Sequence, residues 1–312
     1  MKKFTISLPV LINFIFLISL VVSCTQQEKH VDIILSNILS SKTAIEQYIT
    51  KQSIDKSVHP IFVTFWDFDG TILKGDCSEG YKENDRQIYR GLVQIAIEQN
   101  FSKLYKENEF DVFFNYYEHL DRTQGHLAAY TYLTTIFAGQ NEDAIIKLST
   151  QYFNETLQHY YFSSSIAIMN ELIKNNIHIY IISASPDFFV KGAAQSLKIN
   201  PDAIHGIKLK NVNGILTNTI VPPVTYAKGK TMKVLQIMKH LQQKYSTDHV
   251  YALAAFGNSY HTDGPFLEYV AKQKLPAGTP VAVMINGGKE PDAYKGLFYC
   301  VKQSKIIQYS YK

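Results

Sequence analysis

The alternation of apolar runs with helix-periodic stretches along the chain predicts an α/β protein. Four short apolar runs have the length and composition of buried strands and cover residues 61–67, 177–182, 249–256 and 279–285. Apolar side chains at helical intervals predict helices at residues 31–50, 166–174, 187–197 and 230–244. Because strands that alternate with helices build parallel sheets with both faces covered, we expect a doubly wound parallel sheet.

Residues 81–165 interrupt this alternation. They are rich in Tyr, Phe, Gln, Glu and Lys, carry no strong strand signal, and repeat Ile88, Leu92 and Ile95 at helical spacing. We therefore predict a helical insertion at 81–165 between two parts of the core. Those parts are residues 59–80 and 166–305, with a turn-rich patch at 200–225 and a C-terminal tail at 306–312.

The first 24 residues have the pattern of a secretory signal. A basic start with Lys2 and Lys3 is followed by an apolar run, and then by Ser23 and Cys24. The ending Val-Val-Ser-Cys resembles a bacterial lipobox, which predicts removal of residues 1–23 and a lipid on Cys24. An uncleaved membrane anchor is the alternative, since the run is nearly long enough to span a bilayer; Pro9 and Asn13 within the run weaken it.

From this leader we expect an exported protein, held to a bacterial membrane by its lipid, with its folded domain in the periplasm or outside the cell. Residues 24–58 are then a linker and leading helix. Removing residues 1–23 takes away two lysines and no acids, so the net charge falls from +4 to +2. That charge is too small and too dispersed for nucleic-acid binding, and the sequence predicts no protein partner. With only Cys77 and Cys300 besides Cys24, the chain is no disulfide scaffold.

Polar residues follow the apolar runs, where a parallel sheet binds its ligands. The first run ends in Asp67 and Asp69, the second in Ser183, and the third in Asn258, with Asp263 close behind. Two crowded carboxylates repel each other, and a divalent cation with its preference for oxygen ligands removes that cost. A lysine pair, Lys228 and Lys230, lies at the start of the helix before the third run.

These segments resemble the four motifs of the haloacid dehalogenase superfamily of phosphohydrolases. The matching segments are DFDGT at 67–71, Ser183 in IISAS, Lys230 in AKGKT, and GNSYHTD at 257–263. Their order is similar to that of the branch related to phosphoserine phosphatase, with a helical cap between the first two motifs. The resemblance covers about residues 60 to 285.

The resemblance implies Mg²⁺-dependent hydrolysis of a small phosphorylated metabolite. It assigns Asp67 as the nucleophile that forms an aspartyl-phosphate, and Asp69 as general acid and then base. Ser183 would donate a hydrogen bond to the phosphoryl group and Lys230, preferred over Lys228, would add a fixed positive charge. Mg²⁺ would bind Asp67, the backbone carbonyl of Asp69 and the fourth motif.

The fourth motif departs from the family pattern, because Asn258 stands where relatives generally carry an aspartate. Either Asn258 or Asp263 could be the main metal ligand there. Asp76 falls where phosphoserine phosphatases hold a substrate amino group, which suggests a substrate such as phosphoserine or phosphocholine. Two alternatives remain open at this point: a phosphotransferase that uses the same intermediate, and a non-catalytic ligand-binding lipoprotein on the same fold.

Overall fold

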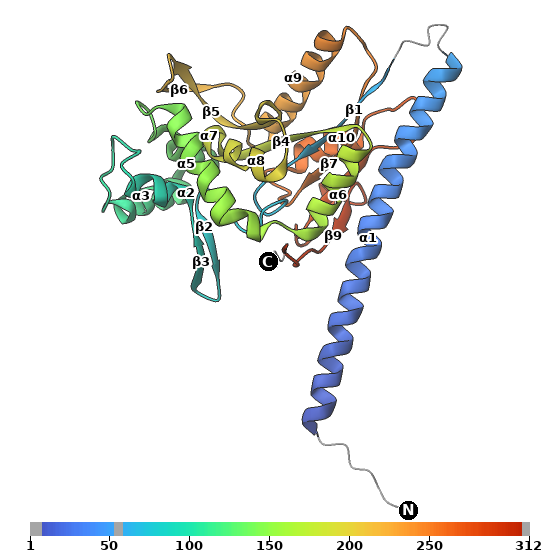
Figure 1. Ribbon diagram of the computed structural model, residues 1–312, viewed down its shortest axis with the longest axis horizontal. Coiled ribbons are helices and arrows are strands. Elements are labelled where there is room, and N and C mark those ends of the chain that lie inside the picture. Colours follow the sequence, from blue (N-terminus) through green and yellow to red (C-terminus); the bar gives the residue numbers. More distant parts are fainter. Residues whose placement is uncertain (1–7, 53–58, 308–312) are drawn as a thin grey trace, which may run out of the picture.

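The computed structural model describes residues 8–52 and 59–307. Parts of the predicted signal (1–7), linker (53–58) and tail (308–312) lie outside the described residues. Figure 1 shows a long helix beside a globular part in which the strands lie between helices.

A seven-stranded sheet forms the centre of the globular part, in the order β6-β5-β4-β1-β7-β8-β9. Every neighbouring pair is parallel except β5 and β6. The strands are β1 (Ile61–Trp66), β4 (Ile177–Pro186), β5 (Ile204–Val212), β6 (Ile215–Val221), β7 (Val250–Gly257), β8 (Val281–Ile285) and β9 (Tyr299–Val301). The predicted α/β class with a doubly wound, mostly parallel sheet is thus confirmed.

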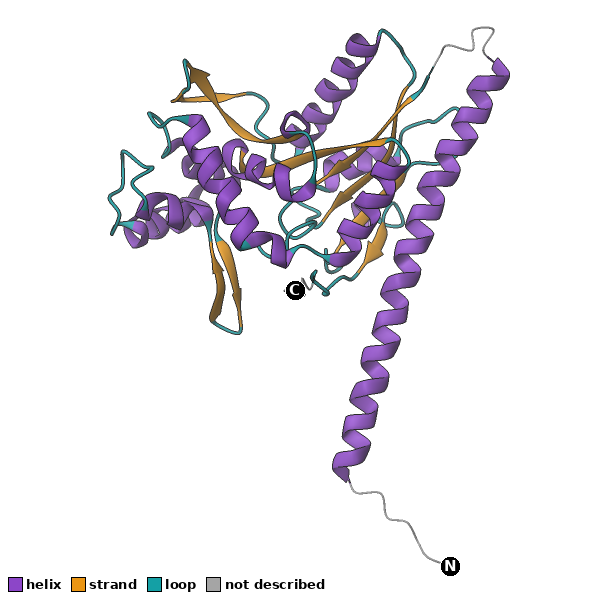
Figure 2. Ribbon diagram, viewed as in Figure 1, coloured by secondary structure: helices purple, strands orange, loops and turns teal. Residues whose placement is uncertain are grey.

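Helices cover both faces of the sheet, as the alternating strands require (Figure 2). One face packs against α1 (Leu8–Gln52) and α6 (Ser163–Lys174), and the other against α9 (Lys228–Tyr245) and α10 (Gly264–Ala271). Residues of β1 alternate between two hydrophobic clusters: Phe62 and Trp66 belong to the first, Val63 and Phe65 to the second. The central strand therefore has both faces buried. Its packing on both sides fixes the position of the residues that follow Trp66.

The segment between β1 and β4 is mainly helical, as predicted, but it starts with a hairpin that the sequence analysis missed. Its helices are α2 (Leu92–Glu98), α3 (Phe110–Gln124), α4 (His126–Thr135) and α5 (Glu142–Glu155), and the hairpin pairs β2 (Gly80–Glu83) with β3 (Arg86–Arg90). The hairpin turns through Asn84 and Asp85, with φ of 50° and 60°, which is the backbone of a tight type I′ turn. The strands are short and mostly polar, so no apolar alternation marks them.

The expectation of a turn-rich patch at 200–225 was also wrong. Most of it forms β5 and β6, which turn at Asn213 and Gly214 with φ of 53° and 84°. An Asn-Gly pair between two partly apolar runs is a strong hairpin signal. The short strand β9 was likewise not expected, because only three residues pair with β8.

The expected leading helix at 31–50 is the C-terminal part of α1, which begins at Leu8 and is continuous to Gln52. Its residues Ile34, Ile38, Ile45 and Ile49 are buried at helical spacing. The described part of the predicted linker, residues 24–30, is therefore helical. Across the described ranges no helix has both the length and the hydropathy to cross a membrane.

Candidate active site

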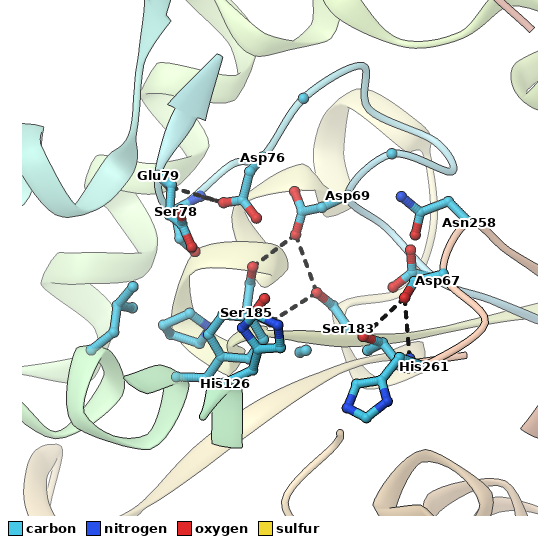
Figure 3. A pocket seen from close by; sticks show the side chains of 18 residues that line it. Asp67, Asp69, Asp76, Ser78, Glu79, His126, Ser183, Ser185, Asn258 and His261 are labelled. Atoms are coloured by element: carbon cyan, nitrogen blue, oxygen red, sulfur yellow. Dashed lines mark hydrogen bonds between the residues drawn. The ribbon is translucent and has the colours of Figure 1, made fainter. Parts of the chain in front are cut away.

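The carboxyl ends of β1, β4 and β7 meet around a cavity of about 410 Å³ (Figure 3). Core residues form one side of the cavity, and the segment after β1 together with α4 forms the other. The lining residues that carry chemistry are Asp67, Asp69, Asp76, Glu79, His126, Ser183, Ser185, Asn258 and His261. The structure thus brings together the predicted residues of the first, second and fourth motifs.

Asp67 directly follows β1, and its backbone continues the parallel ladder by donating to Phe256 O at 2.8 Å. The chain then turns back at Gly70, with φ of 74°. This turn places Thr71 Oγ1 2.9 Å from Asp67 Oδ2, to which it donates. Burial, followed by the nearby charge of Asp263, raises the pKa of Asp67 to about 6, although Lys230 works against this rise.

Lys230 lies beneath Asp67 and is fully buried. Its Nζ donates to Asp67 Oδ1 at 2.5 Å and to Asp263 Oδ1 at 2.6 Å. Burial opposes its charge, but the carboxylates of Asp263 and Asp67 raise the pKa of Lys230 above its usual value. Lys228, the alternative lysine, is exposed at the first position of α9. Of the two, the structure places Lys230 beside the predicted nucleophile.

A close backbone approach explains why a glycine precedes Lys230. A Cβ on Gly229 would lie 1.7 Å from the carbonyl oxygen of Val224, so a side chain there would push the start of α9 away. Ala227, which caps the helix, has φ of 48° and ψ of −119°, a conformation that a residue with a side chain rarely adopts. The strained turn and the glycine together set the depth at which Lys230 enters the site.

Asp263 has both carboxylate oxygens engaged within the protein. Its Oδ1 accepts from Lys230, and its Oδ2 accepts from the backbone N–H groups of Asn258 and Ser259 at 2.9 and 3.0 Å. A Cβ on Gly257 would lie 2.6 Å from Cβ of Asp263, so this glycine allows the loop to fold over the carboxylate. Asp263 therefore holds the fourth-motif loop and Lys230 in position.

Asp69 points into the cavity from the other side of the turn (Figure 3). Its Oδ1 accepts from the Cys77 N–H at 2.7 Å, and its Oδ2 accepts from Ser185 Oγ at 2.7 Å and from Ser183 Oγ at 3.4 Å. Burial, then the charges of Asp76 and Asp67, raise the pKa of Asp69 well above its usual value. The carboxyl group is therefore poised to hold a proton beside an ionised neighbour.

Ser185 is a site residue that the sequence analysis did not select. The sequence does contain a signal for it, because residues two apart on a strand share one face, so Ser183 and Ser185 of the Ser-Ala-Ser triplet point the same way. The Ser185 N–H also donates to Ser183 Oγ at 3.0 Å. Ser183 is thereby fixed at the edge of the cavity.

Asp76 and Glu79 form an acidic wall opposite the core residues. Asp76 Oδ1 accepts from the N–H groups of Ser78 and Glu79 at 2.7 and 2.8 Å, and Glu79 accepts a hydrogen bond from Tyr117 of α3. Burial raises the pKa of Asp76, and burial together with the charge of Asp76 raises the pKa of Glu79 to about 7. The sequence places both residues in the segment after the first motif, 74–79, which we expect to face the site, but only Asp76 was given a role.

Four rings join the cap to the core at the mouth of the cavity, from His126 and Tyr130 of α4 and from Tyr226 and His261 of core loops. The centroid distances are 5.8 Å for His126–Tyr130, 6.3 Å for His126–His261, 5.6 Å for Tyr226–His261 and 5.8 Å for Tyr130–Tyr226. His126 had no sequence signal, because its position at the cavity depends on how α4 packs on the core, whereas His261 lies within the fourth-motif segment but was given no role there.

The oxygen donors around Asp67 suit a hard divalent cation. The amide oxygen of Asn258 points toward the Asp67 carboxylate (Figure 3). A Cβ on Gly70 would lie 1.9 Å from Asn258 Nδ2, so Gly70 leaves space for that amide against the turn. Carboxylate, amide and backbone carbonyl oxygens are the donors that Mg²⁺ accepts. A second group, Asp69, Asp76 and Cys77, brings ligand atoms within 4.8 Å of one another, but burial raises the pKa of the Cys77 thiol and keeps it neutral.

Comparison with known proteins places this site in a family. Residues 64–268 match the family model of haloacid dehalogenase-like hydrolases, and a search of curated protein sequences finds no match. The fold is similar to that of a protein of unknown function from Bordetella pertussis Tohama I, with 11% identity, a TM-score of 0.55, and coverage of 78% of this chain and 99% of the other. It is also similar to a functionally unknown protein from Anaerococcus prevotii, with 12% identity, a TM-score of 0.52, and coverage of 82% and 90%.

A probable phosphoserine phosphatase from Vibrio cholerae also matches, with 14% identity and coverage of 76% of this chain and 60% of the other. Its TM-score of 0.42 is too low to support any argument about activity. At these identities the likenesses to solved structures concern the fold alone.

Proposed function

Since the chain belongs to the haloacid dehalogenase-like hydrolase family, we propose that it hydrolyses a small phosphomonoester with Mg²⁺ through an aspartyl-phosphate on Asp67. The family model identifies a hydrolase, and the proposal concerns its phosphatase activity, reaction course, metal and substrate. One observation carries it: Asp67 is held by Lys230 and Thr71 at the floor of a cavity that Asp69 faces from the other side.

In the first half of the reaction an Asp67 oxygen attacks phosphorus. The bond from phosphorus to the ester oxygen breaks, and the Asp69 carboxyl group gives its proton to the leaving alcohol. In the second half Asp69, now ionised, takes a proton from water as that water attacks the phosphorus of the acyl-phosphate. Inorganic phosphate leaves, and both aspartates return to their starting states.

The neighbours of the two aspartates suit these roles. Lys230 and Thr71 keep Asp67 in one orientation, and ordering the nucleophile before the reaction lowers its barrier. Ser185 and the Cys77 N–H hold Asp69 at the opposite side of the cavity. We propose that Ser183, which lines the cavity, donates to a phosphoryl oxygen.

Mg²⁺, when bound, would neutralise charge on the phosphoryl oxygens. We propose Asp67, the backbone carbonyl of Asp69 and Asn258 as its protein ligands. We do not include Asp263 among the direct ligands, because its oxygens already accept from Lys230 and from the N–H groups of Asn258 and Ser259. Its proposed role is to hold Lys230 and the fourth-motif loop in position. With an amide in place of a carboxylate, the site carries one negative charge fewer and should bind Mg²⁺ more weakly.

The cavity wall favours a substrate whose leaving alcohol carries a positive charge. Asp76 and Glu79 supply negative charge, and Tyr130 supplies an aromatic face that attracts cations. Among the described residues that line the cavity none is Lys or Arg. A phosphoserine carboxylate would therefore have only the His126 and His261 side chains as basic partners among the described lining residues, whereas a choline-like ammonium group would face Asp76 and Glu79. We propose a phosphocholine-like substrate ahead of phosphoserine.

We further propose that the protein is exported and carries a lipid on Cys24. The support is the order of the basic start, apolar run and Cys24 in the sequence. Labelling cells with a lipid precursor and comparing the parent protein with Cys24→Ala tests this: the parent should incorporate the label and the variant should not.

Phosphate release from a panel of substrates tests the proposed reaction. Phosphocholine, phosphoserine, a sugar phosphate and p-nitrophenyl phosphate would be compared with and without EDTA. We expect EDTA-sensitive release, with the highest kcat/KM for phosphocholine. Binding of phosphocholine without turnover would favour the non-catalytic alternative, to which Asn258 gives some support. Transfer of phosphate to added alcohols in place of its release would favour a phosphotransferase.

A further inference from the structure

A second, larger hollow lies at the opposite edge of the sheet from the catalytic cavity. It has a volume of about 740 Å³ and shares no lining residue with that cavity. The starts of β4 and β5 and the second half of α9 line it, together with the loop after α8 (Ala194–Leu197). We call it the amino-edge groove, defined by His178, Tyr180, Lys198, His205, Lys233 and Lys244.

The amino-edge groove is rich in positive charge. Lys198, Lys233 and Lys244 line it, and Asp202 is the one acidic side chain on its wall among the described residues. None of these lysines forms an ion pair with a described carboxylate. Lysines gathered without acidic partners repel one another, and an anion between them removes that repulsion.

A buried histidine nitrogen in the same groove has no partner. His205 Nε2 is shielded from solvent and makes no hydrogen bond within the described protein. Burial, then the charge of Lys233, lowers the pKa of His205 to about 4, so its ring is neutral at physiological pH. Buried polar atoms are nearly always paired in native proteins, and an unpaired one indicates a missing ligand or water.

The groove also contains two parallel aromatic rings. The rings of Tyr180 and His205 have centroids 6.3 Å apart and an interplanar angle of 1°. Both side chains belong to neighbouring strands on the sheet face against which α9 packs, and both line the groove. Aromatic side chains that line a groove can contact a planar group of a ligand.

We propose that the amino-edge groove binds a small anion with a planar ring. The ring lies against Tyr180 and His205, and its phosphate or carboxylate group lies toward Lys233 and Lys244. The volume is in the range of small-molecule sites in proteins. Charge complementarity separates this occupant from a second copy of the chain, which would have to bring its own acidic patch to the lysines.

Histidine ring resonances allow a direct test, because different histidines report on the two sites. His178, His205 and His240 line the amino-edge groove, whereas His126 and His261 line the catalytic cavity. Adenosine 5′-monophosphate would be titrated into Asp67→Asn, in which turnover is blocked. Adenosine, which lacks the negative charge, and inorganic phosphate, which lacks the ring, are the control ligands. Each resonance is assigned by a single His→Gln substitution.

We expect saturable shifts of the groove histidines with the nucleotide, at concentrations about tenfold lower than for adenosine or phosphate. Lys233→Met should raise the midpoint about tenfold. Lys239→Met, on the same helix but outside the groove, should leave it unchanged.

Three outcomes would overturn the proposal: shifts confined to His126 and His261, equal groove shifts with adenosine alone, or equal midpoints for Lys233→Met and the parent. Concentration-dependent dimerisation that leaves the groove histidines unresponsive to the nucleotide would do so too, since it would assign the groove to a second copy.

Discussion

Charged groups are arranged differently on the two sides of the catalytic cavity, which we call the floor (Asp67, Lys230 and Asp263) and the acidic wall (Asp69, Asp76 and Glu79). On the floor, the Lys230 ammonium is buried between the Asp67 and Asp263 carboxylates, and each charge has a partner. On the wall, burial raises the pKa of Asp69, Asp76 and Glu79, and the charge of Asp76 raises those of Asp69 and Glu79 further. On the floor, one ammonium bridges both carboxylates before any ligand binds and leaves a single net negative charge, whereas the wall gains from an added proton or cation.

This difference separates two tasks within one cavity. The floor holds the nucleophile in a fixed geometry, so removing one of its charges should damage folding and chemistry together. The acidic wall determines which substrates bind, and its Asp69 holds the proton for the leaving group. Substitutions there should therefore alter substrate specificity and the pH dependence of activity, with a smaller loss of stability.

Lys230→Met should produce the largest loss. Removing the ammonium leaves two buried carboxylates unpaired, which we expect to cost about 3–5 kcal/mol of unfolding free energy. We expect kcat to fall by roughly 10²–10³-fold in the protein that still folds. Urea unfolding and steady-state kinetics measure the two effects. Lys228→Met, on the exposed residue two positions away, is the matched control and should change neither. Equal effects of the two variants would contradict the assignment.

Asp69→Asn should lower kcat by roughly 10²–10⁴-fold, because an amide can neither give a proton to the alcohol nor take one from water. The loss should be smaller in the first half-reaction for p-nitrophenyl phosphate, whose leaving group needs no proton. Rapid-mixing kinetics separate the two halves. Stability should be nearly unchanged, since the introduced amide oxygen can still accept from the Cys77 N–H; unfolding as severe as that of Lys230→Met would contradict the division between floor and wall.

Asn258→Asp should increase Mg²⁺ affinity about tenfold, since it restores a negative charge to a partly buried ligand. Isothermal titration of metal into the protein without substrate measures this directly. Ser259→Asp, on the neighbouring loop residue, controls for a general effect of added charge. No gain in affinity would mean that Asp263 already serves as the charged ligand.

Asp76→Asn should lower kcat/KM for phosphocholine about tenfold more than for p-nitrophenyl phosphate, because it removes a charge that faces the ammonium group. The amide oxygen can still accept from Ser78 and Glu79 N–H groups, so the loop should keep its shape. Asp85→Asn, in the exposed hairpin turn, is the control. Equal losses on the charged and neutral substrates would remove the case for a cationic leaving group.

Lowering the pH should stabilise the metal-free protein, because it protonates Glu79 of the acidic wall. Glu79 has a pKa of about 7 in the folded state, above its ordinary value of 4.5. It therefore binds a proton more readily folded than unfolded, and its contribution to stability declines as pH rises through about 7. Lowering the pH from about 8 to 6 should raise Tm, and Glu79→Gln should weaken this rise. A Glu79→Gln profile parallel to that of the parent would contradict the prediction.

The apolar pattern was sufficient to predict the core of the fold, because strands buried on both faces read as apolar runs. It missed β2, β3, β5 and β6, whose residues are partly polar and whose pairing depends on turns at Asn84 and Asn213. The positions of Asp67, Asp69 and Lys230 could be predicted because each follows a strand or lies at the start of a helix, and that of Ser183 because it ends the apolar part of β4. His126 could not, since only the packing of α4 on the core brings it to the cavity. Glu79 and His261 lie in segments that were expected at the site, but no pattern singles them out.

The preference for Lys230 over Lys228 has a physical reason that the sequence alone does not contain. Gly229 approaches the Val224 carbonyl so closely that α9 begins with Lys228 outside and Lys230 inside. In the same way, the hydrogen bonds of Asp263 with Lys230 and two N–H groups depend on the conformation of the folded loop and cannot be predicted from spacing. Sequence spacing identifies candidate residues, and the backbone conformation determines which of them lie at the site.

The most direct test of the account is to stop the reaction of the purified, Mg²⁺-loaded protein with acid during turnover and to map phosphate on its peptides by mass spectrometry. The account predicts one added phosphoryl group on Asp67, more of it in Asp69→Asn when p-nitrophenyl phosphate is the substrate, and none in Asp67→Asn. Turnover with phosphate on another residue, or turnover that persists in Asp67→Asn, would contradict it.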